Sequence, residues 1–295
     1  MIRLGPEVEP RLDWLSLLDA FEAGHRLPRA EIGDTFLYRD PDTMLSRAAW
    51  IDGLGLLVKT ATIFPGNAPR KPAIGGAATL FSDADGGPEA LIDFRLLTKW
   101  KTAGDSLLGA RRLARPDSAR LLIVGRGTVA RSLVEAYRAL FPDIAVSLWS
   151  RSGAADLAAE VGAAPVDDLA RAVGEADIVA CATMATEPVL RGEWLQPGTH
   201  VDLIGAYRPD MREADDDALR RADLFVDSRA TTLDHIGELK DPLARGVIRR
   251  EDVVADLYDG DALRRTSPDQ VTLYKNGGGA HLDLMCARWM LDRAA

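Results

Sequence analysis

A continuous apolar run, Leu121–Val124, leads directly into the glycine-rich segment Gly125–Ala130, which matches the pattern GxGxxA. A run of this kind is typical of a parallel strand that is buried on both faces. Apolar residues then recur at helical spacing over Thr128–Leu140. The order of strand, tight glycine turn and helix predicts a Rossmann dinucleotide-binding domain in an α/β protein.

Each part of this turn has a physical reason to meet a dinucleotide. Gly125 permits the tight turn, and Gly127 lets the backbone approach a pyrophosphate closely. The helix that begins at Thr128 and Val129 offers N–H groups and the positive end of its dipole to the phosphates. We therefore predict that these four residues bind the cofactor, the alternative being an ordinary tight turn between a strand and a helix.

The end of the second expected strand indicates which dinucleotide binds. Domains that select NAD usually place an acidic residue there, which bonds the ribose 2′-hydroxyl. This sequence has Ser150, Arg151 and Ser152, with Ser150 lying 23 positions after Gly127. A cation between two hydroxyls suits a 2′-phosphate, so NADP(H) is favoured and NAD(H) remains possible. In the alternative interpretation, Arg151 is a solvated loop residue.

Two further segments follow expected strands and are predicted to lie near the cofactor. Thr183 and Met184 come shortly after the apolar run Ile178–Cys181, and Lys275 precedes the glycines at 277–279. Loops at the carboxyl ends of parallel strands are where open α/β sheets bind ligands. The glycine run could equally be a flexible bend into the last helix.

The pattern along the chain divides its 295 residues into two domains. Short strand-like runs separated by turn signals predict a mostly antiparallel sheet between Asp34 and Leu97. Strands alternate with helices after Pro116, which predicts a parallel sheet whose signals fade near Asp227. A helix over Glu251–Leu257, a strand over Gln270–Tyr274 and a final helix from His281 are also expected. This pattern predicts an α+β domain over residues 1–113, followed by a Rossmann domain over residues 114–276.

Charge and composition exclude several classes of function. The net charge of −9 and the lack of a basic stripe disfavour nucleic-acid binding. No apolar stretch approaches the roughly 18 residues of a membrane helix, and the N-terminus lacks the order of a signal peptide. Cys181 and Cys286 form no metal-binding pattern, and the four histidines have no ligand spacing. A cytoplasmic protein without a metal or a membrane partner is expected.

Several segments together resemble the ornithine cyclodeaminase and mu-crystallin family. They are Val58-Lys59-Thr60, Phe64-Pro65-Gly66-Asn67, Lys101-Thr102-Ala103, the glycine turn, Gly198–Tyr207, Phe225-Val226-Asp227-Ser228, Gly237-Glu238-Leu239 and Gln270–Lys275. The resemblance implies that residues 277–295 return to the first domain, making it a discontinuous α+β substrate-binding and dimerisation domain (residues 1–113 and 277–295). It further implies a homodimer formed through the sheet of that domain. It also implies chemistry at a C=N bond next to a carboxylate.

The resemblance assigns roles to a few cations. Lys59 stands where the family has a substrate-facing lysine, and Lys101 where many members have an arginine that binds the substrate carboxylate. Arg29 and Arg47 are alternative candidates for a second carboxylate-binding arginine. Lys59 also interrupts an apolar strand, and a buried ammonium must have a partner. For each of the others, a solvated surface charge is the ordinary alternative.

Tyr207 marks a departure from the family pattern. Cyclodeaminases carry an aspartate there that acts as general acid and base, and a tyrosine is a poor base near neutral pH. We therefore predict that Tyr207 is a site residue that forms an aromatic wall under the ring rather than acting as an acid. The departure favours NADPH-dependent reduction of a preformed cyclic ketimine, Δ1-pyrroline-2-carboxylate or Δ1-piperideine-2-carboxylate, to L-proline or L-pipecolate. The alternatives are an ornithine cyclodeaminase with catalytic NAD, an alanine dehydrogenase, and a non-enzymatic NADP-dependent ligand-binding protein.

Overall fold

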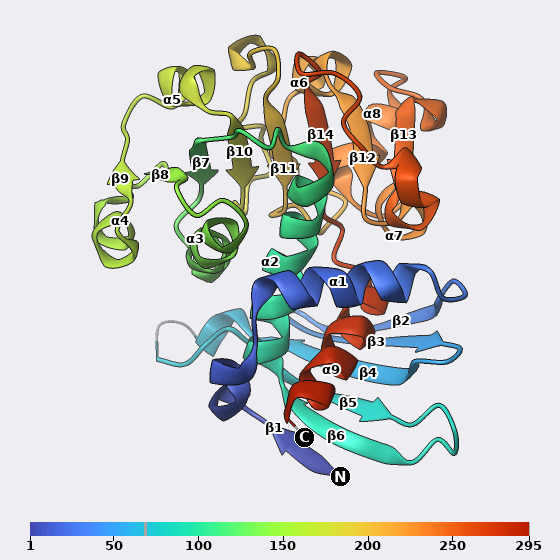
Figure 1. Ribbon diagram of the computed structural model, residues 1–295. Helices are drawn as coiled ribbons and strands as arrows, with labels where there is room; N and C mark the ends of the chain where they lie inside the picture. Colours follow the sequence, from blue (N-terminus) through green and yellow to red (C-terminus); the bar gives the residue numbers. More distant parts are fainter. Residues whose placement is uncertain (68–69, 295) are drawn as a thin grey trace. The chain divides into compact units, whose positions relative to one another are not determined.

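A computed structural model describes residues 1–67 and 70–294, which form two compact units (Figure 1). Unit 1 consists of Met1–Lys101 and the C-terminal segment from Gly279 onward, and unit 2 consists of Thr102–Gly278. The first boundary therefore falls within helix α2 (Phe94–Leu113), earlier than the boundary at residue 113 expected from the sequence.

Unit 1 is built on one six-stranded sheet in the described residues, with the order β1-β6-β5-β4-β3-β2. Its strands are β1 (Ile2–Leu4), β2 (Glu31–Arg39), β3 (Asp42–Ile51), β4 (Gly55–Ile63), β5 (Ile74–Phe81) and β6 (Pro88–Asp93). Strands β2 to β6 pair antiparallel and β1 pairs parallel with β6. The predicted antiparallel sheet is thus confirmed.

Two helices cover one face of this sheet, as Figure 1 shows: α1 (Trp14–His25) and α9 (Ala280–Ala294). Alternate residues of β4 point toward that face, and Leu57, Lys59 and Ala61 are buried there. Val58, on the opposite face, is 38% exposed. The side chain of Lys59 therefore lies between the sheet and its helical layer, where a charge needs partners.

Unit 2 is built on an eight-stranded parallel sheet in the described residues, with the order β13-β12-β14-β11-β10-β7-β8-β9. The strands are β7 (Arg120–Val124), β8 (Ala145–Trp149), β9 (Ala164–Pro165), β10 (Ile178–Cys181), β11 (His200–Leu203), β12 (Asp223–Val226), β13 (Val253–Asp256) and β14 (Thr272–Lys275). The helices are α3 (Thr128–Leu140), α4 (Ala155–Val161), α5 (Leu169–Glu175), α6 (Asp216–Arg221), α7 (Arg229–Thr232) and α8 (Gly237–Ala244). This is the predicted Rossmann architecture.

The order of the strands fixes where this sheet can bind a ligand. The chain runs from β7 to β8 and β9 on one side, and then returns to β10 and β11 on the other side of β7. The order reverses between β7 and β10, and such a switch point opens a crevice at the carboxyl ends of the strands. Val173 of α5, Leu219 of α6 and Leu239 of α8 belong to the apolar core that these helices form with the sheet.

Some sequence predictions were wrong or incomplete. Glu251–Leu257 was expected to be a helix, but only a 3-10 turn at Arg250–Asp252 precedes β13. Pairing with β12 determines the conformation of β13, overriding the local pattern. The parallel sheet also continues beyond Asp227 through β13 and β14, and β3 was not predicted. In the described residues, no helix is both long and apolar enough to cross a membrane.

Candidate active site

The glycine turn between β7 and α3 has the geometry that a pyrophosphate needs. Gly125 has φ of +139°, and a Cβ there would lie 2.5 Å from the carbonyl oxygen of Ala182. A Cβ at Gly127 would meet no atom of the described chain within 4 Å, so the space beside it is open. Gly127 is also the N-cap of α3, and within the described residues no side chain caps that end. The backbone N–H groups of the first turn can therefore receive an anion.

The predicted 2′-phosphate residues form a tight turn after β8. The hydroxyl of Ser150 donates to the carbonyl oxygen of Gly153 at 2.6 Å, and the N–H of Gly153 donates back to the carbonyl of Ser150 at 2.9 Å. Arg151 and Ser152 occupy the two central positions of this turn and are exposed. Their side chains can reach a phosphate outside the sheet, whereas the hydroxyl of Ser150 is hydrogen-bonded within the turn.

The loop after β10 lies against the glycine turn, on the other side of β7. The N–H of Ala182 donates to the carbonyl of Val124 at 2.8 Å, and Ala182 makes the close approach to Gly125 described above. Thr183 follows it and is half-buried, while Met184 is 67% exposed. Both predicted residues therefore stand at the switch point of the sheet.

The side chain of Lys275, at the end of β14, donates hydrogen bonds to backbone carbonyls. Its side chain is fully buried, and its Nζ donates to the carbonyls of Leu203 at 2.9 Å and Asn276 at 2.8 Å. Asn276 in turn donates to the carbonyl of Thr102 and to the hydroxyl of Ser106. The ammonium of Lys275 thus holds the ends of β11 and β14 together.

In unit 1, Lys59 forms a buried ion pair that the sequence did not predict. Its Nζ lies 2.8 Å from Oδ1 of Asp283 in α9, and the two side chains are 8% and 0% exposed. The same ammonium stands 5.0 Å from the centre of the Phe94 ring. Burial lowers the pKa of Lys59, as do the charges of Lys101 and Arg47, while Asp283 acts in the opposite direction.

Arg47 and Lys101 complete a group of cations around Asp283. Arg47 lies directly opposite Lys59 in the β3–β4 ladder, and its guanidinium pairs with Asp34 at 2.7 Å. Lys101 of α2 is buried. Burial acts to raise the pKa of Asp283, but Lys59, Lys101 and Arg47 outweigh it and hold that pKa below its ordinary value. Three cations therefore act together on this one buried carboxylate.

Two buried histidines adjoin the same group. The rings of His25 and His281 contact edge to face, with centroids 5.3 Å apart, and Nδ1 of His25 donates to the carbonyl of Phe21 at 2.7 Å. Burial lowers the pKa of His25 to about 4. Burial also lowers the pKa of His281 well below its usual value, and the charges of His25, Lys101, Arg47 and Arg29 act in the same direction. Arg29 is exposed and acts on both rings. Both imidazoles are therefore neutral at physiological pH.

The loop after β11 carries Tyr207 and Asp210 at the surface. The Tyr207 ring is 51% exposed and lies 5.9 Å from the guanidinium carbon of Arg208. Asp210 receives two hydrogen bonds from Arg208, both 2.9 Å long, and these lower its pKa. Its carboxylate is therefore engaged at the surface and is poorly suited to act as a base.

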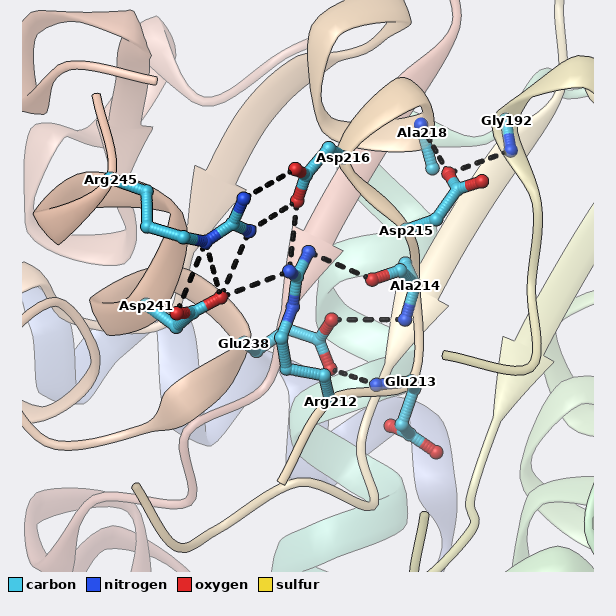
Figure 2. Close-up of polar contacts among 10 residues, drawn as sticks. All are labelled: Gly192, Arg212, Glu213, Ala214, Asp215, Asp216, Ala218, Glu238, Asp241 and Arg245. Atoms are coloured by element: carbon cyan, nitrogen blue, oxygen red, sulfur yellow. Dashed lines mark hydrogen bonds and ion pairs between the residues drawn. The ribbon is translucent and has the colours of Figure 1, made fainter. Parts of the chain in front are cut away.

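Two more buried carboxylates, Glu213 and Glu238, were missed by the sequence analysis. Figure 2 shows Glu238 accepting hydrogen bonds from the N–H groups of Glu213 at 2.8 Å and Ala214 at 3.0 Å. Glu213 lies in the acidic run that continues to Asp217, which in sequence is indistinguishable from a solvated loop. Asp216 of that run does lie outside, where it pairs with Arg212 and Arg245 (Figure 2).

The fold and these sites define an enzyme with a Rossmann dinucleotide-binding unit and a separate unit that carries a buried cationic group. The model of the ornithine cyclodeaminase/mu-crystallin family matches residues 53–295, and the chain belongs to this family. It is 55% identical over 292 residues to the Delta(1)-pyrroline-2-carboxylate reductase of Paracoccus denitrificans, with 95% of this chain and 92% of that protein covered.

Two solved structures share the whole fold. One is the Delta(1)-pyrroline-2-carboxylate reductase of Thermococcus litoralis in complex with NADH and L-proline, with a TM-score of 0.89 and 25% identity, covering 100% of this chain and 97% of that one. The other is an archaeal alanine dehydrogenase dimer with bound NAD, with a TM-score of 0.90 and 27% identity, covering 100% and 96%. The predicted family and enzyme class, an imine reductase, are thereby confirmed.

Proposed function

We propose that this protein reduces a cyclic ketimine 2-carboxylate, Δ1-pyrroline-2-carboxylate or Δ1-piperideine-2-carboxylate, to L-proline or L-pipecolate, with NADPH as the favoured reductant. In this reaction a hydride adds to the carbon of the C=N bond and a proton adds to its nitrogen. The bound dinucleotide supplies the hydride. The protein supplies the position of the ring, the charges that hold it and the proton.

The observation that carries the proposal is the buried cationic group of unit 1. Lys59 and Arg47 stand directly opposite each other on neighbouring strands, an arrangement that is unfavourable between like charges. Lys101 adds a third positive charge that acts on the same carboxylate, Asp283. Asp283 pairs with Lys59 and Asp34 pairs with Arg47, and the substrate carboxylate next to the C=N bond would add a third negative charge beside the three cations.

The residues take distinct roles in this proposal. Lys101 and Arg47 bind the substrate carboxylate, and the guanidinium of Arg47 can do so with two parallel hydrogen bonds. Arg29 is the alternative arginine, at the exposed edge of the group. Lys59 is held by Asp283 and hydrogen-bonds the ring nitrogen, to which it delivers the proton. Tyr207 forms an aromatic wall.

The preference for NADPH rests on the turn after β8. Arg151 and Ser152 are exposed at its centre, and the turn contains no acidic residue that would repel a 2′-phosphate. The relatives named above that were solved with a cofactor carry NADH or NAD. NADH is therefore the second candidate, and the two reductants are to be compared directly.

The test is a steady-state assay of the purified protein that follows oxidation of the reduced nicotinamide. Each of the two ketimines is supplied with NADPH and with NADH. Turnover of either ring supports the proposal, and absence of turnover with both rings and both reductants overturns it. Ammonia release from L-ornithine would instead identify a cyclodeaminase, and oxidation of NADH with pyruvate and ammonia an alanine dehydrogenase.

A matched pair of lysine variants tests the carboxylate site. Lys101→Met removes a buried cation of the group, and Lys99→Met removes a cation two residues away that pairs with Glu9. We expect the first to raise KM for the ketimine about tenfold to a hundredfold, since a charged hydrogen bond contributes about 1.5–3 kcal/mol. We expect the second to leave KM unchanged. Equal effects of the two variants would contradict the assignment of Lys101.

We also propose that the open face of the unit 1 sheet joins two copies into a homodimer. Trp50 is 49% exposed and Val58 38% exposed on this face, where they line a hollow with Leu56 and Phe81. Every residue of the edge strand β2 is exposed along its whole length. Long, unprotected edge strands and apolar patches of this kind are usually covered by a partner.

A further inference from the structure

Glu213 is a fully buried carboxylate that lies between two loops of unit 2. It stands in the segment that connects β11 to α6, and its side chain is fully buried. The neighbouring Asp215 caps α6 and accepts from the N–H groups of Ala218 and Gly192, and Asp216 pairs with Arg212 (Figure 2). Burial raises the pKa of Glu213, and only hydrogen-bond donors and nearby cations make its charge tolerable there. Its surroundings must therefore contain several donors.

Those donors come from the ends of two neighbouring parallel strands. Oε1 of Glu213 accepts from the backbone N–H of Thr183 at 2.7 Å and from its hydroxyl at 2.8 Å. Oε2 accepts from the N–H of Gly205 at 2.6 Å and, more weakly, from that of Ala206 at 3.4 Å. Thr183 follows β10 and Gly205 follows β11, so one carboxylate fastens both loops.

The two loops approach so closely that there is no room for a side chain at Gly205. A Cβ on Gly205 would lie 2.0 Å from the carbonyl oxygen of Thr183 and 2.6 Å from Oε1 of Glu213. The backbone of Glu213 is itself fixed by Glu238, as described above. The result is a chain of fixed contacts that runs from α8 through Glu213 to Thr183.

The position of Thr183 along the sheet decides which part of the dinucleotide it can serve. The pyrophosphate site lies after β7, and the ribose 2′-site lies after β8 on one side of it. The nicotinamide half must then extend to the other side, over the loops after β10 and β11. These are the two loops that Glu213 fastens.

We infer that Glu213 is a positioning residue for the nicotinamide half of the cofactor, acting through the loops at Thr183 and Gly205. This inference rests on the proposed dinucleotide chemistry and adds to it a residue outside the glycine turn. The four groups that contact its carboxylate, from Thr183, Gly205 and Ala206, all donate to it. An amide of the same shape would set its own N–H groups against one pair of them.

The experiment compares a whole cofactor with the fragment that lacks nicotinamide. Binding of NADPH and of 2′-phospho-ADP-ribose to Glu213→Gln is measured by calorimetry, with NADH and ADP-ribose as the parallel pair. We expect the Kd of the whole dinucleotide to rise about tenfold to a hundredfold, the range for loss of charge-assisted hydrogen bonds. The Kd of the fragment should stay within about twofold. Glu187→Gln, which removes the same charge from an exposed position near Thr183, should change neither.

The other outcomes each give a decision. Unchanged NADPH and NADH binding in Glu213→Gln overturns the inference alone, whereas a wild-type protein that binds neither dinucleotide overturns the proposed function as well. Equal weakening of cofactor and fragment would show a general loss of the fold, which also contradicts a positioning role. If Glu213→Gln does not fold, Thr183→Val removes the hydroxyl that donates to Glu213 and accepts weakly from the N–H of Ala185, and it should weaken the whole dinucleotide selectively by about threefold to tenfold. No selective loss in that variant overturns the inference.

Discussion

The ion pair between Lys59 and Asp283 should make the stability of this enzyme depend on a single buried charge. Asp283→Asn keeps the shape of the side chain and one acceptor oxygen, but it removes the negative charge 2.8 Å from the Lys59 ammonium. Removing one partner of a buried pair typically costs about 3–5 kcal/mol, because the other charge stays buried. We expect the free energy of unfolding to fall by about that amount near neutral pH.

The loss of stability in Asp283→Asn should depend on pH through the protonation of Lys59. Burial, Lys101 and Arg47 already lower the pKa of Lys59, and loss of the Asp283 charge lowers it further. A lysine with a lower pKa in the folded state binds fewer protons there than in the unfolded state, so stability rises with pH between the two values. The deficit of Asp283→Asn should therefore shrink as the pH is raised and Lys59 becomes neutral.

At acid pH the deficit should also shrink, for a different reason. The pKa of Asp283 in the folded wild-type protein is held below its ordinary value. Its stabilising contribution is present above the unfolded pKa and is lost as the pH falls through the folded pKa. Below that pH the carboxyl group of Asp283 is neutral in the wild-type protein, as the amide is in Asp283→Asn, so the two proteins differ less in stability.

The assay is urea unfolding followed by tryptophan fluorescence across a range of pH, with a double-mutant cycle at Lys59 and Asp283. Lys59→Met with Asp283→Asn should cost less than the sum of the single changes, since the double variant leaves no unpaired charge. The pair of Lys99 and Glu9 provides a matched control, with a 2.7 Å separation but side chains 24% and 33% exposed. Glu9→Gln should cost no more than about 1 kcal/mol. A deficit in Asp283→Asn that is equally small, or that does not change with pH, would refute the reasoning.

Three further predictions concern other sites. Arg151→Asp should lower the ratio of kcat/KM for NADPH to that for NADH by about tenfold to a hundredfold; an unchanged ratio in the steady-state assay would count against an NADP site. Asp202 accepts a hydrogen bond from Tyr137, and burial raises the pKa of Asp202 to about 7. The folded state therefore keeps a proton that the unfolded state releases. As a result, the free energy of unfolding falls as the pH rises from about 4 to 7. Asp202→Asn should remove this fall and raise the free energy of unfolding at about pH 8 by at most about 4 kcal/mol; urea unfolding at about pH 5 and 8 tests this, and a variant with the same pH profile as the wild type would contradict it. Trp50→Glu should convert the proposed dimer into a monomer of 31.9 kDa, as measured by light scattering after gel filtration; a monomeric wild-type protein would disprove the dimer.

Local patterns predicted those parts of the fold that local physics determines. The apolar run Leu121–Val124 and the glycines after it have few alternatives to a buried strand and a tight turn. By contrast, Arg47 and Ser46 break the alternation in β3, and that strand forms because β2 and β4 pair with it on both sides. The 3-10 turn and strand at residues 250–256 likewise depend on pairing with β12, which the local sequence does not contain.

The site residues divide in the same way. Lys59 could be predicted because a lysine within an apolar strand is conspicuous. Its partner Asp283 lies 224 residues away, in a helix where most of the residues from Ala280 to Met290 are buried, and no local pattern connects the two. Glu213 resembles its solvated neighbours in composition, and only the close approach of the loops after β10 and β11 shows that its side chain points inward.

The division of unit 1 between the two ends of the chain has a consequence for how the protein is made. Unit 2 is continuous, and its last strand, β14, is complete at Lys275, so it can fold while the chain is still being synthesised. The first 101 residues leave the ribosome earlier, yet they lack α9 and the carboxylate that balances Lys59 until the segment from Gly279 onward emerges. The unit that begins first is therefore completed last, and a chain that stops before α9 would carry a sheet that lacks part of the helical layer on its buried face.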